Sequence, residues 1–260
     1  GTLSAAGGWG YNYGGAGTIF RKADSQSNGT IILGNNNHTH TVTPLSMEDY
    51  SFDGIEMSDG AWIQLTSGYL FSGGDFTVLT GTAYFDVPAG ISSGPTFTSL
   101  SVAPGGILTH SSNGSNHDYS LIMDIDGPVF IAEGGEINAD GRGYADPYGP
   151  GVGTTSDYAG GGGAYGGNGG RSRRSATDGG TAYGSVKEPT DAGSAGGRSS
   201  NSSAPGGHGG GAIKIAATGT FTVDGSISSD GNNGGLVSDR CGGGGAGGSI
   251  WLEAGTFTGE

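Results

Sequence analysis

Aspartates beside turn residues are the first groups in this sequence that could do chemistry. Steps such as Asp140-Gly141 and Asp230-Gly231 bring oxygen ligands close to tight turns, and Ca²⁺ in proteins takes about six to eight oxygen ligands. None of these steps matches an EF-hand loop or the nonapeptide of calcium-binding β-rolls. A plain turn and a structural Ca²⁺ site therefore both remain open. The candidate Ca²⁺ ligands are Asp124, Asp126, Asp140, Asp224 and Asp230.

Paired carboxylates could also hydrolyse a polysaccharide, since a glycosidase holds two of them about 5–10 Å apart across the scissile bond. Asp124 and Asp126 share one face if their segment is a strand, because strand side chains alternate. A polysaccharide lyase would need a basic residue beside an acidic sugar, yet Lys and Arg are scarce. The glycine runs lack the strand–glycine–helix context of phosphate-binding loops. We therefore assign no catalytic residue and expect no enzyme.

Aromatic residues that could stack on a sugar or on another copy of the chain occur in two places. Trp9, Tyr11 and Tyr13 alternate, so on an extended segment they share one face. That face either covers the end of a β core or forms an edge for self-association or sugar stacking. Tyr144 and Tyr165 lie among glycines with few other apolar groups. We expect these two tyrosines to anchor loops or to contact a partner.

Arginine side chains form one basic cluster, made by Arg171, Arg173 and Arg174, which holds three of the ten cations. A solvated loop explains the cluster most simply. The alternatives are a contact with acidic surfaces of a neighbouring copy and a protease-sensitive loop, since the segment is poor in apolar residues. The cluster is therefore a candidate for self-association.

The composition excludes several classes of function. Of the 260 residues 60 are glycine, and 10 Lys and Arg stand against 24 Asp and Glu, for a formal charge of −14. This balance argues against nucleic-acid binding and against an anionic membrane surface. No apolar run approaches the ~18 residues of a membrane helix. The single cysteine, Cys241, excludes an internal disulfide and leaves a plain loop residue or an intermolecular bond.

Four segments differ in composition and must position these groups. Residues 1–17 are a glycine- and aromatic-rich lead-in, and residues 18–133 contain short β-prone runs between turn residues. Residues 134–211 hold 26 glycines in 78 positions, which predicts either disorder or close backbone packing in polyproline-II-like segments. Residues 212–260 return to strands. No stretch has the apolar periodicity of a helix.

Two short strands and a turn recur along the chain. Leu121 to Ile125, followed by 127–131 and Ile137, resembles Ala212 to Ile215, followed by 219–227. A further copy begins at Gly248 and continues to Gly259. Such units bury their apolar side chains only by stacking on neighbours. The sequence therefore predicts an all-β fold, a parallel β-solenoid with long glycine-rich loops, with a β-sandwich as the alternative.

Five glycine-rich phrases carry a resemblance to a known group of proteins. The phrases are residues 14–20, 134–144, 161–167, 209–213 and 244–252. Through them the chain resembles glycine-rich modules of large microbial surface and adhesin-like proteins, which alternate short β-helical rungs with glycine-rich insertions. It is also similar, more weakly, to glycine-rich tip adhesins of phage tail fibres, which would place a binding surface in loops within 145–205. The resemblance implies an extracellular role and no catalytic residues.

Together these observations predict an extracellular or cell-surface module, structural or adhesive, that self-associates or attaches to surfaces. Its expected partners are other copies, neighbouring modules of a longer chain, or cell-surface glycans. Nucleic acid and membrane insertion are not expected, and Ca²⁺ is the one cofactor considered. The first alternative is a carbohydrate-binding module that stacks sugars on Trp9, Tyr11, Tyr13 and the tyrosines of 144–183. The second is a β-helical polysaccharide-degrading enzyme.

Overall fold

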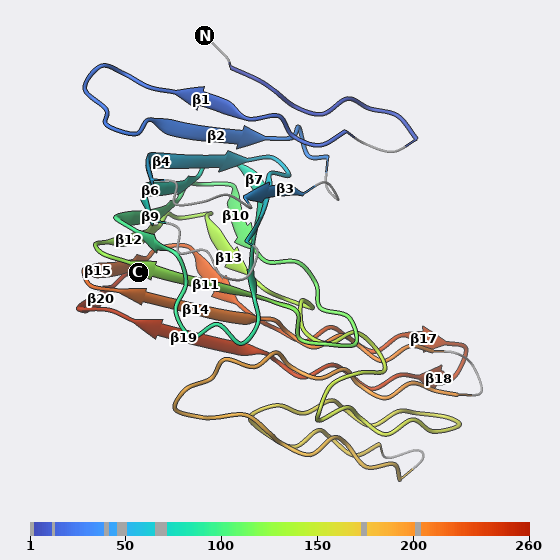
Figure 1. The fold of residues 1–260 in the computed structure, drawn as a ribbon. Coiled ribbons are helices and arrows are strands. Elements are labelled where there is room, and N and C mark those ends of the chain that lie inside the picture. The colour runs from blue at the N-terminus through green and yellow to red at the C-terminus, as the bar shows by residue number, and fades with distance from the viewer. Residues whose placement is uncertain are drawn as a thin grey trace.

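The computed structural model describes residues 3–11, 14–38, 42–45, 51–65, 72–172, 176–200 and 204–260. Within these ranges every regular element is a β-strand, so the expected all-β fold is confirmed. Nothing in the described part of the chain is a helix long and apolar enough to cross a membrane. Figure 1 shows strands stacked from the N-terminal end downwards, with a second body of extended segments beside the lower strands.

The first ladder consists of seven strands that pair in parallel, one per level of the stack. We call each level a rung. Runs such as Thr30-Ile31-Ile32-Leu33 form strands because β-branched and apolar residues pack well on a pleated surface, and here all but Ile32 are buried. The strands are, in order, β2 (Thr30–Gly34), β4 (Ser51–Ser58), β6 (Ser72–Val78), β9 (Ser99–Val102), β12 (Val129–Ile131), β15 (Thr220–Val223) and β20 (Thr256–Thr258).

Two further parallel ladders form the other faces of the stack. The second ladder contains β3 (Thr43–Leu45), β5 (Trp62–Leu65), β7 (Gly81–Pro88), β10 (Gly106–Thr109), β13 (Glu136–Asn138) and β16 (Ser226–Ser228). The third contains β8 (Thr96–Phe97), β11 (Tyr119–Ile125), β14 (Ala212–Ala217) and β19 (Ser249–Glu253). In the third ladder Leu121 pairs with Ile213, and Ile213 pairs with Ile250.

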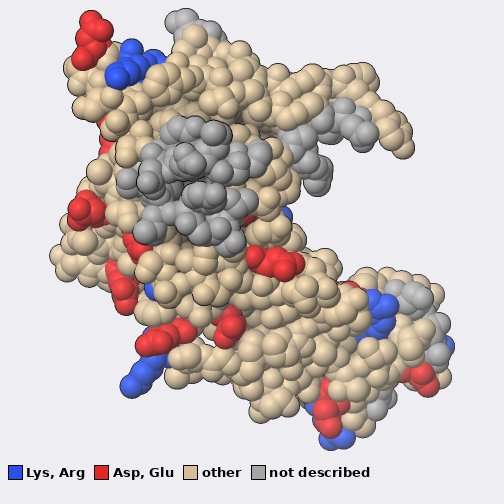
Figure 2. All heavy atoms as spheres, viewed as in Figure 1, with Lys and Arg blue, Asp and Glu red and all other residues tan. Residues whose placement is uncertain are grey.

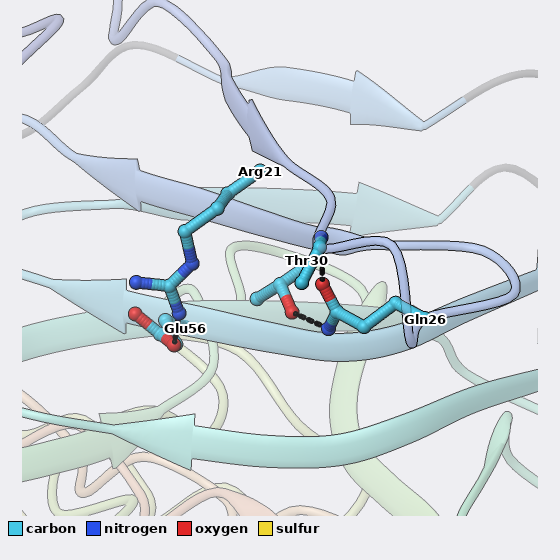
Figure 3. Close-up of polar contacts among 5 residues, drawn as sticks. Arg21, Gln26, Thr30 and Glu56 are labelled. Atoms are coloured by element: carbon cyan, nitrogen blue, oxygen red, sulfur yellow. Dashed lines mark hydrogen bonds and ion pairs between the residues drawn. The ribbon is translucent and has the colours of Figure 1, made fainter.

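Antiparallel pairs make the sheets mixed, so a wholly parallel arrangement is wrong. The strand β1 (Ile19–Arg21) pairs antiparallel with β2, the start of β11 with the end of β7, and β17 (Leu236–Val237) with β18 (Arg240–Cys241). Short hairpin links explain β1–β2 and β17–β18, because a parallel pair needs a longer crossover. In the first hairpin, Gln26 bonds Thr30 within the turn and Arg21 forms a 2.8 Å ion pair with Glu56 (Figure 3).

Inward side chains of the first ladder form one apolar column through the stack. Phe76 of this column also packs edge-on against Phe85 and Phe97, with ring centroids 5.3 and 5.0 Å away. Each position pairs in register with the next. The column consists of Ile31, Ile55, Phe76, Leu100, Val129, Phe221 and Phe257.

A buried histidine joins the rungs on either side of the glycine-rich insertion. The Nδ1 of His110 lies 2.8 Å from the carbonyl of Ser111, and its Nε2 accepts the backbone N–H of Ala212 at 3.2 Å. These partners require a neutral ring with the proton on Nδ1. Burial accordingly lowers the pKa of His110 to about 3. Next to it, the buried carboxylate of Asp86 accepts bonds from Trp62 Nε1 and the Ser111 N–H.

The second body, which we call the glycine lobe, consists of the described residues within 139–211 and 229–248 (Figure 1). Its segments lie side by side and are joined mainly by backbone hydrogen bonds. One such row runs from Tyr144 N–H to Gly193 O, from Gly193 N–H to Gly210 O, and from Gly210 N–H to Ala246 O. These bonds pair the backbone N–H and C=O groups of the lobe, which would otherwise be unsatisfied where segments lie against one another.

The lack of a side chain on glycine makes this packing possible. A Cβ on Gly243 would lie 1.9 Å from the carbonyl oxygen of Gly161, and one on Gly207 would lie 1.9 Å from that of Asn232. No residue other than glycine fits at such a distance, because carbon and oxygen atoms in contact are normally more than 3 Å apart. Glycine is therefore required at these positions for close approach of the backbones.

Candidate functional site

The last rung of the stack, formed by β19 and β20, has an unpaired edge. On one side β19 pairs with β14 and β20 pairs with β15. On the other side no described strand pairs with either of them. The second ladder ends one level earlier, at β16. We call β19 and β20 the terminal rung, and its free backbone groups are a template for another strand.

The apolar column is open at the terminal rung. Phe221 is completely buried, whereas Phe257, the next member of the column, is 53% exposed although its ring stacks on Phe221 at 5.7 Å. At the opposite end β1 covers Ile31 of β2, which is only 4% exposed, but Phe20 of β1, in register with Ile31, is 57% exposed. Ile250 of β19, in register with buried Ile213, is also exposed. Both ends of the column thus expose a phenylalanine side chain.

The far end of the glycine lobe presents a second exposed surface, which we call the tip surface. Three loops meet there, because Ser200 N–H bonds the carbonyl of Ser156 and Cys241 N–H bonds that of Tyr158. Leu236 and Val237 of the β17–β18 hairpin are exposed beside them. The half-buried Cys241 belongs to β18. The tip surface therefore exposes apolar side chains on loops whose backbones are fixed.

Charged contacts also hold these loops. The guanidinium of Arg240 lies 4.8 Å from the ring centroid of Tyr158 and donates to the carbonyl of Asp157. Ser200 Oγ donates to the Asp157 carboxylate at 3.0 Å. The tip surface is consequently ordered before any partner arrives, which lowers the entropic cost of binding.

The alternating aromatics of the lead-in do not cover the stack with their side chains. Trp9 is 82% exposed and Tyr11 is fully exposed, while Tyr13 lies outside the described residues. The arm that carries them folds back on itself through a bond from Gly14 N–H to Gly8 O. It is attached to the stack by a bond from Gly7 N–H to the side chain of Asn35. These rings remain available to a partner.

Three tyrosines of the glycine-rich region lie near the boundary between the lobe and the stack. Tyr165 and Tyr183 pack edge-on with ring centroids 5.3 Å apart, and Tyr144 lies 6.3 Å from the ring of His117. Burial raises the pKa of Tyr144 and Tyr165, and the charge of Asp191 contributes to both increases. These tyrosines therefore lie inside the lobe rather than on its outer surface.

The candidate Ca²⁺ ligands fall into separate places. Asp140 Oδ1 accepts the backbone N–H of Asp230 at 2.6 Å, so these two lie together on adjacent rungs. Asp124 belongs to the end of β11 and Asp126 follows that strand, and burial raises the pKa of Asp124. Asp224 is in register with neither the Asp140–Asp230 pair nor the Asp124–Asp126 pair. Among the described residues no three acidic, His or Cys side chains form a group suited to a metal ion. A Ca²⁺ site stays a prediction.

Basic side chains are sparse on the described surface. Arg171 is exposed and forms a 3.2 Å ion pair with Asp178, within its own loop, whereas Arg173 and Arg174 lie outside the described residues. Figure 2 shows a mostly uncharged surface on which acidic side chains are scattered rather than gathered. Neither an acidic nor a basic patch dominates this face.

Some residues of these surfaces were not expected from the sequence. In the sequence nothing distinguishes Phe257, Leu236 and Val237 from ordinary strand residues. Only the position of their strands in the fold shows that they are exposed. No protein-family model, curated protein or solved structure matches the chain significantly. The functional argument therefore rests on the chain's own fold, surfaces and sequence.

Proposed function

We propose that the three parallel ladders are the faces of a β-solenoid with polyproline-II-like glycine segments, and that the chain is a structural module that self-associates through its terminal rung. The observation that carries this proposal is the exposure of Phe257 at the end of a column whose other members are buried. The column's members from Ile31 to Phe221 are all covered by a neighbouring strand on each side. A surface of this kind is stabilised when another rung covers it.

A second copy of the chain fits the terminal rung. Its own terminal rung offers the same free backbone groups and the same exposed Phe257 and Ile250. Two copies related by a twofold axis would pair these edges antiparallel and cover both phenylalanines, which is an isologous contact. The charge of −14 on each copy opposes association at low ionic strength. Salt should therefore strengthen the pair.

Sedimentation equilibrium at several protein concentrations tests this association. We expect a dimer whose dissociation constant decreases as salt is added. Phe257→Asp should weaken the dimer about thirtyfold or more, because burying each of the two half-exposed phenylalanines contributes roughly 1 kcal/mol. A monomer at all concentrations would refute the proposal.

A phenylalanine elsewhere on the stack supplies the matched control. Phe130 of β12 is 44% exposed and lies in the middle of the first ladder, between β9 and β15. Phe130→Asp introduces the same charge at a similar exposure without touching the terminal rung. Equal weakening by Phe130→Asp and Phe257→Asp would place the contact elsewhere, and would also refute the proposal.

Attachment to a surface is a second candidate function, supported by the tip surface. Leu236 is 72% exposed on a hairpin fixed by backbone bonds to its neighbours. This arrangement favours binding of a partner without loss of loop entropy. Adsorption of the labelled chain to bacterial cells tests it. Leu236→Ser should reduce adsorption. Val186→Ser is the control, because it alters an 86% exposed residue outside the three tip loops and should leave adsorption unchanged. Equal adsorption of the original chain and both variants would refute attachment through the tip surface.

An extracellular or cell-surface location follows as part of this proposal. It is supported by the glycine-rich composition and by the resemblance to surface and adhesin-like modules. The carbohydrate-degrading alternative has weaker support. Asp124, Asp126 and Glu253 line a hollow of about 400 Å³, but Asp126 also accepts a bond from Thr218 and no sugar-binding aromatic lines that hollow.

A further inference from the structure

A pocket of about 300 Å³ lies where the glycine lobe meets the third ladder. One wall consists of three outward side chains in register on consecutive rungs: Ile122 of β11, Lys214 of β14 and Trp251 of β19. The loop from Glu188 to Asp191, which belongs to the lobe, forms the opposite wall. The remaining lining residues are Gly90, Ile91, Ser92, His117 and Ser120.

Polar groups around the pocket are fixed by contacts within the protein. The ammonium of Lys214 donates to the carbonyl of Ser92 at 2.7 Å and lies 4.4 Å from the ring centroid of Trp251. His117 Nε2 lies 2.8 Å from Ser120 Oγ. The pocket therefore has walls that need little rearrangement to receive a ligand.

Charges in the pocket favour a neutral ligand. Burial lowers the pKa of His117 although Asp191 and Asp118 act in the opposite direction, so its ring is neutral at pH 7. The carboxylates of Glu188 and Asp191 would repel an anion. Lys214, which already lies over the aromatic wall, would repel a cation. A ligand with many hydroxyl groups can bond both the negative and the positive side chains, because hydroxyls donate to carboxylates and accept from an ammonium.

Apolar surface complements these polar groups. Ile91, Ile122 and Trp251 line the same pocket, and sugar rings combine hydroxyl groups with an apolar face of C–H groups. From this combination we propose that the pocket binds one residue of a neutral carbohydrate, a pyranose without carboxylate or amine. The site is separate from the tip surface and uses the outward side of β19, whereas the terminal rung uses its inward side. If the pocket binds no carbohydrate, the proposed self-association is unaffected.

Titration of the whole chain with monosaccharides tests the proposal. We would record saturation-transfer NMR and calorimetry with glucose, galactose, mannose, glucuronic acid and glucosamine at neutral pH. The expected result is binding of at least one neutral hexose, with glucuronic acid and glucosamine weaker. Absence of binding by all three neutral hexoses at millimolar concentration would overturn the proposal. So would stronger, salt-sensitive binding of glucosamine, which would indicate a site for cations.

Variants identify the pocket as the place of binding. Asp191→Asn and Glu188→Gln should each weaken binding about tenfold or more, the usual effect of losing a charged hydrogen-bond partner. Glu188 is exposed, and among the described residues it bonds only through its backbone N–H, so Glu188→Gln should fold normally even if Asp191→Asn does not. Trp9→Phe, on the exposed arm, is the control and should bind as the original chain does. Unchanged affinity in both carboxylate variants would overturn the assignment.

Discussion

Replacement of one lobe glycine by alanine tests whether the glycine lobe is packed through its backbone. Gly209 lies against the strand-like segment of Gly193, and a Cβ added to it would be 1.8 Å from the Gly193 carbonyl oxygen. This distance is about 1.5 Å short of ordinary contact, and the obstacle is backbone, which cannot rotate away. Gly209→Ala must therefore separate the two segments.

The cost follows from the hydrogen bonds at that point. Gly209 N–H bonds the Tyr144 carbonyl, Gly143 N–H bonds the Gly209 carbonyl, and Tyr144 N–H bonds the Gly193 carbonyl. Each buried bond contributes about 1 kcal/mol net, so loss of all three would lower the free energy of unfolding by about 3 kcal/mol. Urea denaturation followed by tyrosine fluorescence and by circular dichroism measures this loss. Hydrogen exchange should show the lost protection at Gly209 and Gly143.

Gly170→Ala is the matched control. Gly170 also belongs to the lobe, but a Cβ on it would meet no atom within 4 Å. The same substitution there should be neutral, or stabilising by roughly 0.5 kcal/mol through the unfolded state. Free energies of unfolding for Gly209→Ala and Gly170→Ala that differ by less than about 0.5 kcal/mol would refute the packing argument, because only the local approach of the backbones distinguishes the two sites.

Two further predictions concern buried polar groups. Burial lowers the pKa of His110 to about 3, against 6.5 for the free side chain. Between these values the unfolded state binds a proton that the folded state excludes. The free energy of unfolding should therefore fall as pH decreases below about 6.5. His110→Asn should lower the urea midpoint at pH 7 but make it less dependent on pH above the range where carboxylates titrate; an unchanged dependence would contradict this role. Tyr183 donates to the Ala192 carbonyl and accepts from Ser194 Oγ at 2.9 Å, so Tyr183→Phe should cost about 1–2 kcal/mol in urea denaturation, and no cost would mean that water replaces the hydroxyl.

Local sequence patterns predict the all-β fold because they depend on neighbouring residues alone. The run from Leu121 to Ile125 is expected as a strand and lies within β11, and the run from Thr82 to Val87 lies within β7. Pairing of Ile213 with Leu121 and Ile250 agrees with the alignment of the similar segments. In each case apolar and turn residues recur at the same spacing, which is information that a single sequence contains.

Contacts between distant segments could not be predicted in this way. The pocket joins Ile122 and Trp251 of the third ladder to Glu188, which approaches them only when the glycine lobe folds back on the stack. Glycine provides no side-chain pattern that indicates which segments lie together, so the position of the lobe has no local signal. The antiparallel hairpin of β1 was missed for a related reason, since its three residues fit either direction of pairing.

The difference between the two ends of the stack decides what kind of assembly can form. Copies that joined the first end of one stack to the last end of another would add head to tail and produce a filament. Phe20 is 57% exposed at the first end and Phe257 is 53% exposed at the last, so both ends have apolar area to bury. The first end is a three-residue antiparallel strand, β1, whereas the last end offers the free edges of β19 and β20. Two terminal rungs therefore match each other better than a terminal rung matches β1. Self-association through terminal rungs alone should stop at a closed pair, and growth into filaments would require a contact at β1.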